Sequence, residues 1–233
     1  MKLLSVVIPC YNEEQTLEEL VERVIAVDLD GIEKELLIVD DGSVDATPAI
    51  IEELARRHPE IRTRAHSRNR GKGAAVRTGF EIATGDVIVI QDADLEYDPG
   101  DYPALLKPIT SGRADVVFGT RFRGEAPHRT IYYWHYVGNR FLTMLSNVLT
   151  NLNLTDMAVC YKMFRREVLD RIGLQEEGFG IDPELTAKVA RQGVRIYEVG
   201  ISYYGRTFEE GKKISWRDTP GFVLCILRYN LFG

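Results

Sequence analysis

Two aspartates, Asp92 and Asp94, follow the short apolar run from Val87 to Ile90. Such a run is typical of a buried strand, so the two carboxylates should emerge side by side where that strand ends. Neighbouring carboxylates repel each other, and Mg²⁺ or Mn²⁺ is commonly held by one or two protein carboxylates together with phosphate oxygens. The pattern predicts a metal site at Asp92 and Asp94. A solvated turn with helix-capping aspartates is the alternative.

A second pair of carboxylates, Asp40 and Asp41, follows the apolar run 36–39 and precedes Gly42 and Ser43. A carboxylate at the end of a parallel strand can accept hydrogen bonds from a ribose, as the acidic residue of a dinucleotide-binding fold does. Asp-Gly-Ser is also ordinary turn chemistry. Both interpretations stay open at this point.

A basic, glycine-flanked turn from Asn69 to Gly73 opens a predicted helix and contains Lys72. Backbone N–H groups and the helix dipole favour a phosphate or carboxylate at such a place. The turn lacks P-loop spacing, and the first strand leads into Pro9, Tyr11 and Asn12 instead of a GxGxxG turn. These absences argue against a P-loop protein and against a nicotinamide-dependent dehydrogenase.

The elements that must position these side chains alternate along the first half of the chain. Short β-branched runs and helical patterns follow one another, which indicates βαβ units, a parallel sheet and an α/β fold. Ligands of such a sheet lie beyond the carboxyl ends of its strands. We expect strands at 3–8, 36–39, 61–66, 87–90 and 116–118, and helices at 13–27, 47–57 (Thr47 as N-cap) and 72–83 (closed by Gly85).

The second half is less regular and richer in aromatic residues. Residues 131–152 contain no acidic side chain and carry an apolar stripe at helical spacing, and a second apolar run covers 222–227. Helices of this kind either lie in a membrane interface or pack on the sheet, and both interpretations are kept. The stripe consists of Tyr133, Val137, Phe141, Leu145 and Leu149, headed by Tyr132, Trp134 and Tyr136.

Composition limits the classes of function. The 233 residues carry a net charge of −6, so no global positive field draws the protein to nucleic acid. The three cysteines are odd in number and widely spaced, which favours reduced thiols in the cytoplasm. No stretch approaches a membrane-spanning helix. We expect one domain over 1–233, in the cytoplasm or peripheral on the cytoplasmic face of a membrane.

Taken together, these motifs are similar to the family 2 glycosyltransferases of the GT-A fold. Later residues resemble the dolichyl-phosphate mannose synthase branch and its bacterial polyprenyl-phosphate relatives. The first set is Pro9, Tyr11, Asn12, Glu13 and Glu14, Asp40 to Ser43, Asn69, Gly71 to Gly73, and Asp92 to Asp94. The later set is Gly119 to Arg121, Asp156, Tyr161, Lys162, Arg206 and Glu210 to Lys212.

The resemblance implies a three-layer α/β/α sandwich with a mainly parallel, mixed sheet, divided into a nucleotide-sugar-binding half at 1–120 and an acceptor half at 121–233. It further implies an inverting transfer of a hexose from a nucleotide-sugar donor, with Asp92 and Asp94 bridging Mg²⁺ or Mn²⁺ to the diphosphate and Asp94 as a catalytic residue. GDP-mannose is favoured as the donor, with UDP-glucose or UDP-N-acetylglucosamine as alternatives because Glu96 stands where many mannose synthases have Gln. The residues implied for the donor are Pro9, Tyr11, Asn12, Glu13, Asp40, Asp41, Lys72, Asp92, Ala93, Asp94, Arg206 and Lys212.

The acceptor side of the resemblance leaves two mechanisms open. A polyprenyl or dolichyl phosphate is already anionic and needs a cationic cradle, for which Arg121, Arg129 and Arg140 are candidates, Arg121 also as a catalytic residue. A sugar hydroxyl would need a general base, and Asp182 is the candidate. Asp182 followed by Pro183 could equally be a helix N-cap. A non-catalytic module that binds nucleotide sugars, a homodimer and a separate membrane-anchoring partner complete the alternatives.

Overall fold

The structure is a computed structural model that describes residues 1–123, 129–130, 132–207 and 218–232. Seven strands form one sheet in the order β3-β2-β1-β4-β6-β5-β7. All neighbouring pairs are parallel except those made by β6, which is antiparallel to both β4 and β5. The strands are β1 Leu3–Cys10, β2 Glu33–Asp40, β3 Ile61–Ala65, β4 Val87–Ile90, β5 Val116–Thr120, β6 Lys162–Arg165 and β7 Ile196–Gly200. The predicted α/β class with a mainly parallel, mixed sheet is confirmed.

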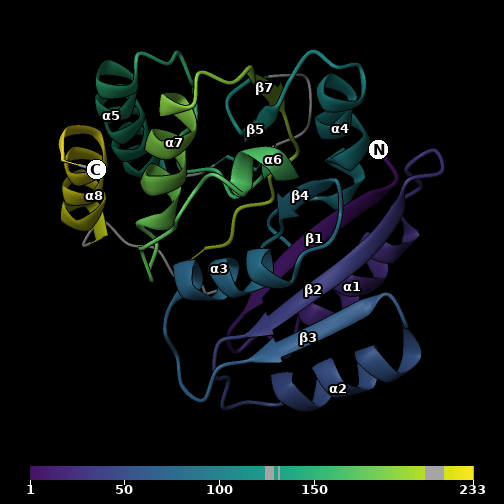
Figure 1. The fold of residues 1–233 in the computed structure, drawn as a ribbon. Coiled ribbons are helices and arrows are strands. Elements are labelled where there is room, and N and C mark those ends of the chain that lie inside the picture. Colours follow the sequence, from purple (N-terminus) through teal and green to yellow (C-terminus); the bar gives the residue numbers. More distant parts are fainter. Residues whose placement is uncertain (124–128, 131, 208–217, 233) are drawn as a thin grey trace.

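Helices cover both faces of the sheet, which gives the predicted three layers (Figure 1). Strand alternation assigns the faces, because successive side chains point to opposite sides. Val7 and Leu37 pack with Phe80 of α3 (Lys72–Ile82) on one face. On the other face the neighbouring strand residues pack with α1 (Leu17–Ala26) and α2 (Thr47–Arg57). The helix α3 lies very close to β1, since a Cβ added at Gly79 would collide with the side chain of Val7.

Three details of the first half differ from the sequence expectation. The helix predicted from residue 13 begins at Leu17, because the carbonyl of Glu13 accepts hydrogen bonds from the amides of Thr16 and Leu17 in a turn that precedes it. Thr47 is the first helical residue instead of the N-cap, and its hydroxyl accepts from the amide of Glu13. The helix α3 ends at Ile82 with Ala83 as its C-cap, so Gly85 does not close it.

The described part of the second half contains two strands, β6 and β7, and four helices that the sequence pattern left unassigned or without bounds. These helices are α5 Tyr133–Thr150, the short α6 Arg166–Leu169, α7 Ile181–Arg191 and α8 Thr219–Leu231. The first half contains a further unassigned helix, α4 Tyr102–Thr110, preceded by the 3₁₀ turn η1 Pro99–Asp101. Helices α5, α7 and α8 pack against one another and form a group at one end of the molecule (Figure 1). This group meets the sheet near the carboxyl ends of its central strands.

The helix α5 packs through part of its apolar stripe. Its fully buried residues are Leu142, Thr143 and Ser146, and Leu145 and Leu149 of the stripe are half-buried against the apolar cluster that contains Leu142. The other end of the stripe is different, since Tyr133 and Phe141 are exposed. The helix therefore leaves some of its large apolar side chains facing outward. Among the described residues, no helix combines the length and the apolar character needed to cross a membrane.

Candidate active site

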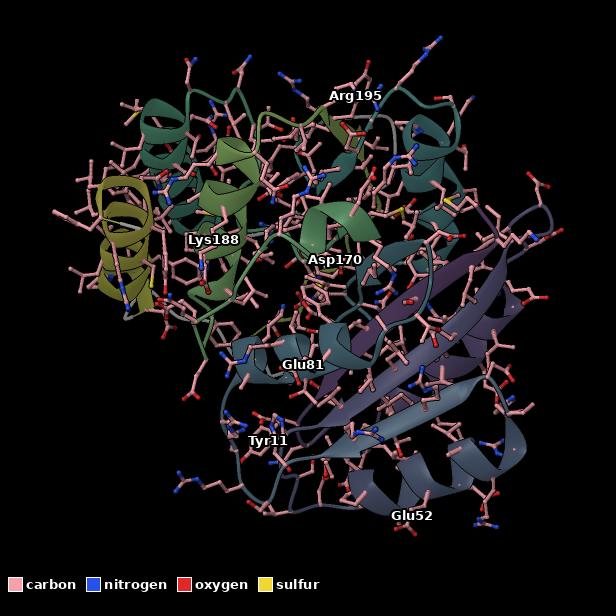
Figure 2. The ribbon with its side chains drawn as sticks, in the orientation of Figure 1. Tyr11, Glu52, Glu81, Asp170, Lys188 and Arg195 are labelled. Atoms are coloured by element: carbon pink, nitrogen blue, oxygen red, sulfur yellow. The ribbon has the colours of Figure 1, made fainter. Side chains whose placement is uncertain are left out.

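A cavity of about 720 Å³ lies where the carboxyl ends of β1, β2 and β4 meet the helices α5, α7 and α8. Tyr11 marks this edge of the sheet, just beyond the end of β1 (Figure 2). Ten of the residues predicted for the site line the cavity: Pro9, Tyr11, Glu13, Asp41, Lys72, Asp92, Ala93, Asp94, Arg121 and Asp182. Residues from both halves of the chain therefore line the same cavity. This cavity lies beyond the carboxyl ends of the strands, where the sequence predicted the ligand site.

The two carboxylates after β4 lie in this cavity and are arranged to accept a cation. Burial, followed by the negative charges of Asp92 and Glu96, raises the pKa of Asp94 to about 7. A divalent ion would relieve this repulsion, and carboxylate oxygens are the ligands that Mg²⁺ and Mn²⁺ prefer. Within the described ranges no group of three or more His, Cys, Asp or Glu side chains forms a potential metal site. The residues therefore fit an ion whose remaining ligands come from elsewhere, such as phosphate oxygens.

Lys72 already supplies one positive charge to these carboxylates. Its Nζ lies 2.6 Å from Oδ1 of Asp92. Burial works to lower the pKa of Lys72, but the charges of Asp92, Cys160 and Asp182 outweigh it and raise this pKa. Lys72 is therefore held as a cation beside the predicted metal site, where it can also meet a phosphate.

The glycine-flanked turn before α3 holds an anion, and this anion belongs to the protein. The carboxylate of Asp41 accepts hydrogen bonds from the amides of Arg70 (3.0 Å) and Gly71 (2.7 Å), and it contacts Nδ1 of His66 at 2.6 Å. The amide of Ala74 donates to the carbonyl of Glu177. The sequence predicted that these backbone N–H groups would bind a ligand. In the structure they bind groups of the protein itself, which fixes the loop that precedes Lys72.

Asp40 and Asn12 shape the neighbouring turn and do not line the cavity. Asp40 accepts from the amide of Ser43 at 3.0 Å, as an Asx turn does. The side-chain oxygen of Asn12 accepts from the amide of Val44 at 3.0 Å. Both side chains therefore connect the ends of β1 and β2, and any role in binding a nucleoside remains a prediction.

Arg121 lines the cavity in a fixed position. Its guanidinium makes a bidentate pair with Asp156, at 2.6 Å from Nε to Oδ2 and 2.7 Å from Nη2 to Oδ1. The same group lies 5.1 Å from the ring centre of Tyr203. Asp156 is fully buried, and although burial acts to raise its pKa, the charge and hydrogen bonds of Arg121 hold the pKa of this carboxyl below its usual range.

Further side chains hold Asp156 in place. Asn139 of α5 donates to its Oδ1 at 3.0 Å. Glu198 of β7 accepts from the amides of Thr155 (2.7 Å) and Asp156 (3.2 Å). The position of Arg121 is thus fixed from β7 and from α5. The sequence indicated Asp156 only through the family resemblance. It gave no signal that Asp156 pairs with Arg121, which lies 35 residues away in the chain.

Of the two interpretations of Asp182, the structure overturns the helix cap, and the role as a general base stays a prediction. The helix α7 begins at Ile181 with Gly180 as the N-cap, so Asp182 is not the cap. Its carboxylate forms an ion pair with the fully buried ammonium of Lys162 on β6. Lys162 also donates to the carbonyl of Val159. The Lys162 partner had no signal in the sequence, because 20 residues separate the two side chains.

Among the described residues, the other predicted cations lie outside the lining of the cavity. Arg206 donates to Oε2 of Glu13 (3.4 Å) and to the carbonyl of Asp94, so it adjoins the turn that carries Asp92 and Asp94. Arg129 donates to the carbonyl of Gly205 at 3.1 Å. Arg140 is exposed on α5. Lys212 lies outside the described residues.

The far end of the cavity is apolar, which the sequence did not reveal. Side chains from α5, from the loop before α7 and from α8 converge there, whereas carboxylates and Lys72 occupy the other end. The apolar residues are Trp134, Leu142, Phe179 and Phe222. The cavity is therefore amphiphilic, with Arg121 lining it as well.

Residues 5–173 match the sequence profile of Glycosyl transferase family 2. The chain belongs to this family. The match spans the metal-site turn, Arg121 and Lys162, so the described cavity is built largely from residues inside the family region.

Characterised members of the family share about a third of the aligned residues. A dolichol-phosphate mannosyltransferase of Pyrococcus furiosus is 32% identical over 187 residues, which cover 79% of this chain and 52% of that protein. An undecaprenyl-phosphate 4-deoxy-4-formamido-L-arabinose transferase of Aeromonas hydrophila is 32% identical over 202 residues, covering 86% of this chain and 60% of that protein. The chain thus spans between half and two thirds of the length of these relatives.

The fold is also that of a known enzyme structure. Glucosyl-3-phosphoglycerate synthase from Mycobacterium tuberculosis, in complex with Mn²⁺, uridine diphosphate and glucosyl-3-phosphoglycerate, superposes with a TM-score of 0.76 and 20% identity. The match covers 98% of this family 2 chain and 80% of the other. At this identity the likeness shows the GT-A fold alone.

Proposed function

We propose that this chain transfers a hexose from a nucleotide-sugar donor to a polyprenyl or dolichyl phosphate. The amphiphilic cavity carries this proposal, because it offers carboxylates and Lys72 to a nucleotide diphosphate and an arginine with apolar walls to a lipid phosphate. The names of the two relatives, which act on dolichol phosphate and undecaprenyl phosphate, support the same substrate class.

The donor occupies the end of the cavity built by the first half. Asp92 and Asp94 would hold Mg²⁺ or Mn²⁺, as the Mn²⁺ and uridine diphosphate bound to the structural neighbour support. When bound, such an ion stabilises the charge that develops on the leaving diphosphate. Lys72 adds a fixed positive charge on the same side. Pro9 and Tyr11 line the cavity where the nucleoside would lie. GDP-mannose is the donor we favour, since one relative is a mannosyltransferase.

The acceptor occupies the end built by the second half. Arg121 is held by Asp156 in one orientation, so binding a phosphate costs little further ordering of its side chain. Phe179 and Phe222 offer an apolar wall to the first carbons of a lipid tail. The acceptor oxygen then attacks the anomeric carbon from the side opposite the diphosphate, which inverts the configuration.

The same half provides a surface suited to a bilayer. Exposed aromatic and aliphatic side chains of α5 and α8 include Trp134 (77% exposed), Val148 (74%) and Leu224 (66%). Tyrosine and tryptophan favour the headgroup region of a membrane. We infer that α5 and α8 rest on the membrane that contains the acceptor, which brings the cavity to the lipid phosphate.

The test has two stages. Thermal unfolding with Mn²⁺ and GDP-mannose, UDP-glucose or UDP-N-acetylglucosamine identifies the donor, because a ligand of the native state raises the melting temperature. Transfer of labelled sugar from that donor to undecaprenyl phosphate, dolichyl phosphate or a free hexose then identifies the acceptor. Transfer to the hexose alone would show that the proposed acceptor class is wrong.

A further inference from the structure

The ion pair between Lys162 and Asp182 is buried at the wall of the cavity and has no part in the proposed transfer. Lys162 has no exposed surface, and the side chain of Asp182 is 9% exposed. Asp182 nevertheless lines the cavity beside Lys72 and Asp92. The carboxylate is thus placed where a reacting acceptor could reach it, yet a buried cation is fixed against it.

Charges of opposite sign alternate across this wall. Asp92 pairs with Lys72, whose ammonium also feels the charge of Asp182, and Asp182 pairs with Lys162. The four side chains come from the end of β4, from α3, from α7 and from β6. The centre of the Phe118 ring lies 5.5 Å from the Lys162 ammonium, so an aromatic ring covers this ammonium on a side that Asp182 does not occupy. A lysine buried in this way is costly unless it is paired, so the burial of Lys162 depends on its ion pair with Asp182.

We propose that Lys162 makes the site selective for acceptors that are already anionic, because it binds the carboxylate of Asp182 and prevents it from acting as a general base. A hydroxyl acceptor or a water molecule must lose a proton as it attacks, whereas a phosphate need not. The Lys162 ammonium donates a hydrogen bond to Oδ1 of Asp182, so this carboxylate oxygen is already occupied by a donor. Lys162 is thus a positioning residue that determines specificity, and Asp182 is its partner in the wall.

The reaction that Lys162 suppresses is hydrolysis of the donor. In that reaction a water oxygen forms a bond to the anomeric carbon while the bond from this carbon to the diphosphate oxygen breaks. The water proton passes to the carboxylate of Asp182, and the products are the free sugar and the nucleoside diphosphate. Without Lys162 the unpaired carboxylate would be available to take this proton.

This inference rests on the proposed function, and the two are tested separately. Transfer from GDP-mannose, with UDP-glucose in parallel, to undecaprenyl phosphate by the unaltered protein tests the function alone. Hydrolysis of the same donors without any lipid acceptor tests the role of Lys162. A protein that transfers to the lipid but shows no effect of Lys162 would overturn only the inference.

The deciding variants are Lys162→Met and the double variant Lys162→Met with Asp182→Asn. We expect Lys162→Met to hydrolyse the donor about tenfold faster than the unaltered protein, or more, because a general base contributes roughly 10² to 10⁴ in rate. The double variant should return to the original rate, since it lacks the carboxylate. Equal hydrolysis by the single and double variants would overturn the proposal.

A matched control lies on the same helix. Lys188 pairs with the fully buried Glu184 at 2.6 Å on α7, outside the lining of the cavity (Figure 2). Lys188→Met therefore also leaves a buried carboxylate without its cation, and it should lower the melting temperature without accelerating hydrolysis. A rise in hydrolysis in this variant would attribute the effect to loosening of α7 and overturn the proposal.

A second measurement decides the matter if Lys162→Met does not fold. Asp182→Asn keeps an oxygen that can accept from Lys162, and the proposal expects transfer to undecaprenyl phosphate to fall by less than about tenfold. A loss of a hundredfold or more, with donor KM unchanged, is the size expected for removing a general base. That result would overturn the proposal.

Discussion

The two halves of the cavity are built in different ways. In the first half, the carboxylates that follow β1 and β2 are fixed by backbone amides of the adjoining turns, as when Asp41 accepts hydrogen bonds from the amides of Arg70 and Gly71. In the second half, the charged groups are fixed by ion pairs between side chains, such as Arg121 with Asp156 and Lys162 with Asp182. The second half also leaves large apolar side chains exposed on α5 and α8.

This difference corresponds to the two tasks of the proposed function, binding of the donor and binding of the acceptor. A nucleotide diphosphate requires preorganised charges, which the rigid edge of a parallel sheet supplies. A lipid acceptor requires an apolar approach and a charge that stays in place beside it. A helix such as α5, which buries Leu142, Thr143 and Ser146, packs through one side and still offers apolar side chains on the other.

The largest expected effect comes from the donor end. Asp94→Ala, or chelation of divalent ions with EDTA, should lower turnover by about a thousandfold, because a metal ion supplies several kcal/mol of charge stabilisation in such a reaction. The fold should persist by circular dichroism. Asp86→Ala is the control, since Asp86 is exposed at the opposite end of β4. Full activity after chelation would show that the metal role is wrong.

The next largest effect tests the proposed contact between Arg121 and the acceptor phosphate. Arg121→Lys keeps the charge but loses the bidentate geometry, so kcat/KM for the lipid phosphate should fall by about ten- to a hundredfold, a loss of roughly 1.4 to 3 kcal/mol. The donor KM should change little. Arg195→Lys is the control, because Arg195 makes a similar pair with Asp115 but lies away from the cavity (Figure 2). An unchanged acceptor constant would contradict the proposed contact.

A third prediction concerns stability alone, at the amino ends of the strands. Glu35 accepts hydrogen bonds from Ser5 (2.6 Å), Thr84 and Gly85 (3.1 Å). Glu35→Ala leaves these donors without an acceptor, which should lower the free energy of unfolding by about 2 kcal/mol. This loss corresponds to a fall of roughly 4 to 8 °C in melting temperature, and kcat should be unchanged. Glu33→Ala, an exposed position on the same strand, should have no such effect. A fall in kcat would mean that this edge also affects the site.

The same carboxylate predicts a dependence on pH. Burial acts to raise the pKa of Glu35, but the hydrogen bonds from Ser5, Thr84 and Arg62 together hold this pKa below its usual range. A depressed folded-state pKa contributes stability that is present above the unfolded value of about 4.3 and is lost as the pH falls through the folded value. Acid unfolding should therefore show a smaller decrease in stability in Glu35→Ala than in the unaltered protein.

The last prediction tests the exposed surface of the second half. Val148→Glu and Leu224→Glu together should reduce binding to vesicles by about tenfold or more, since burial of one such side chain contributes about 1.5 kcal/mol. Activity on detergent-dispersed acceptor should be retained. Val44→Glu is the matched control, because Val44 is 85% exposed in the first half. Equal loss of binding in Val44→Glu would show that no specific face contacts the membrane.

The first half could be predicted because its signals are local. The apolar run before Asp92 specified both β4 and the position of the carboxylates, and the predicted strands agree with the structure within a few residues. The strand β6 was missed because it has only two apolar residues, which lie between Lys162 and Arg165. The strand β7 was missed because it is only partly buried and carries no clear alternation. The apolar end of the cavity was missed because its side chains come from three separate segments.

The sequence by itself determined the class of fold, the family and the order of charged residues at the strand ends, since each depends on spacing along the chain. Only the tertiary structure decided which charges meet. Insertion of the antiparallel β6 between β4 and β5 brings Lys162 to Asp182, and the loop fixed by Glu198 brings Asp156 to Arg121. Burial makes such pairing obligatory, because an unpaired charge inside a protein is costly, but many partners satisfy that requirement until the chain is folded.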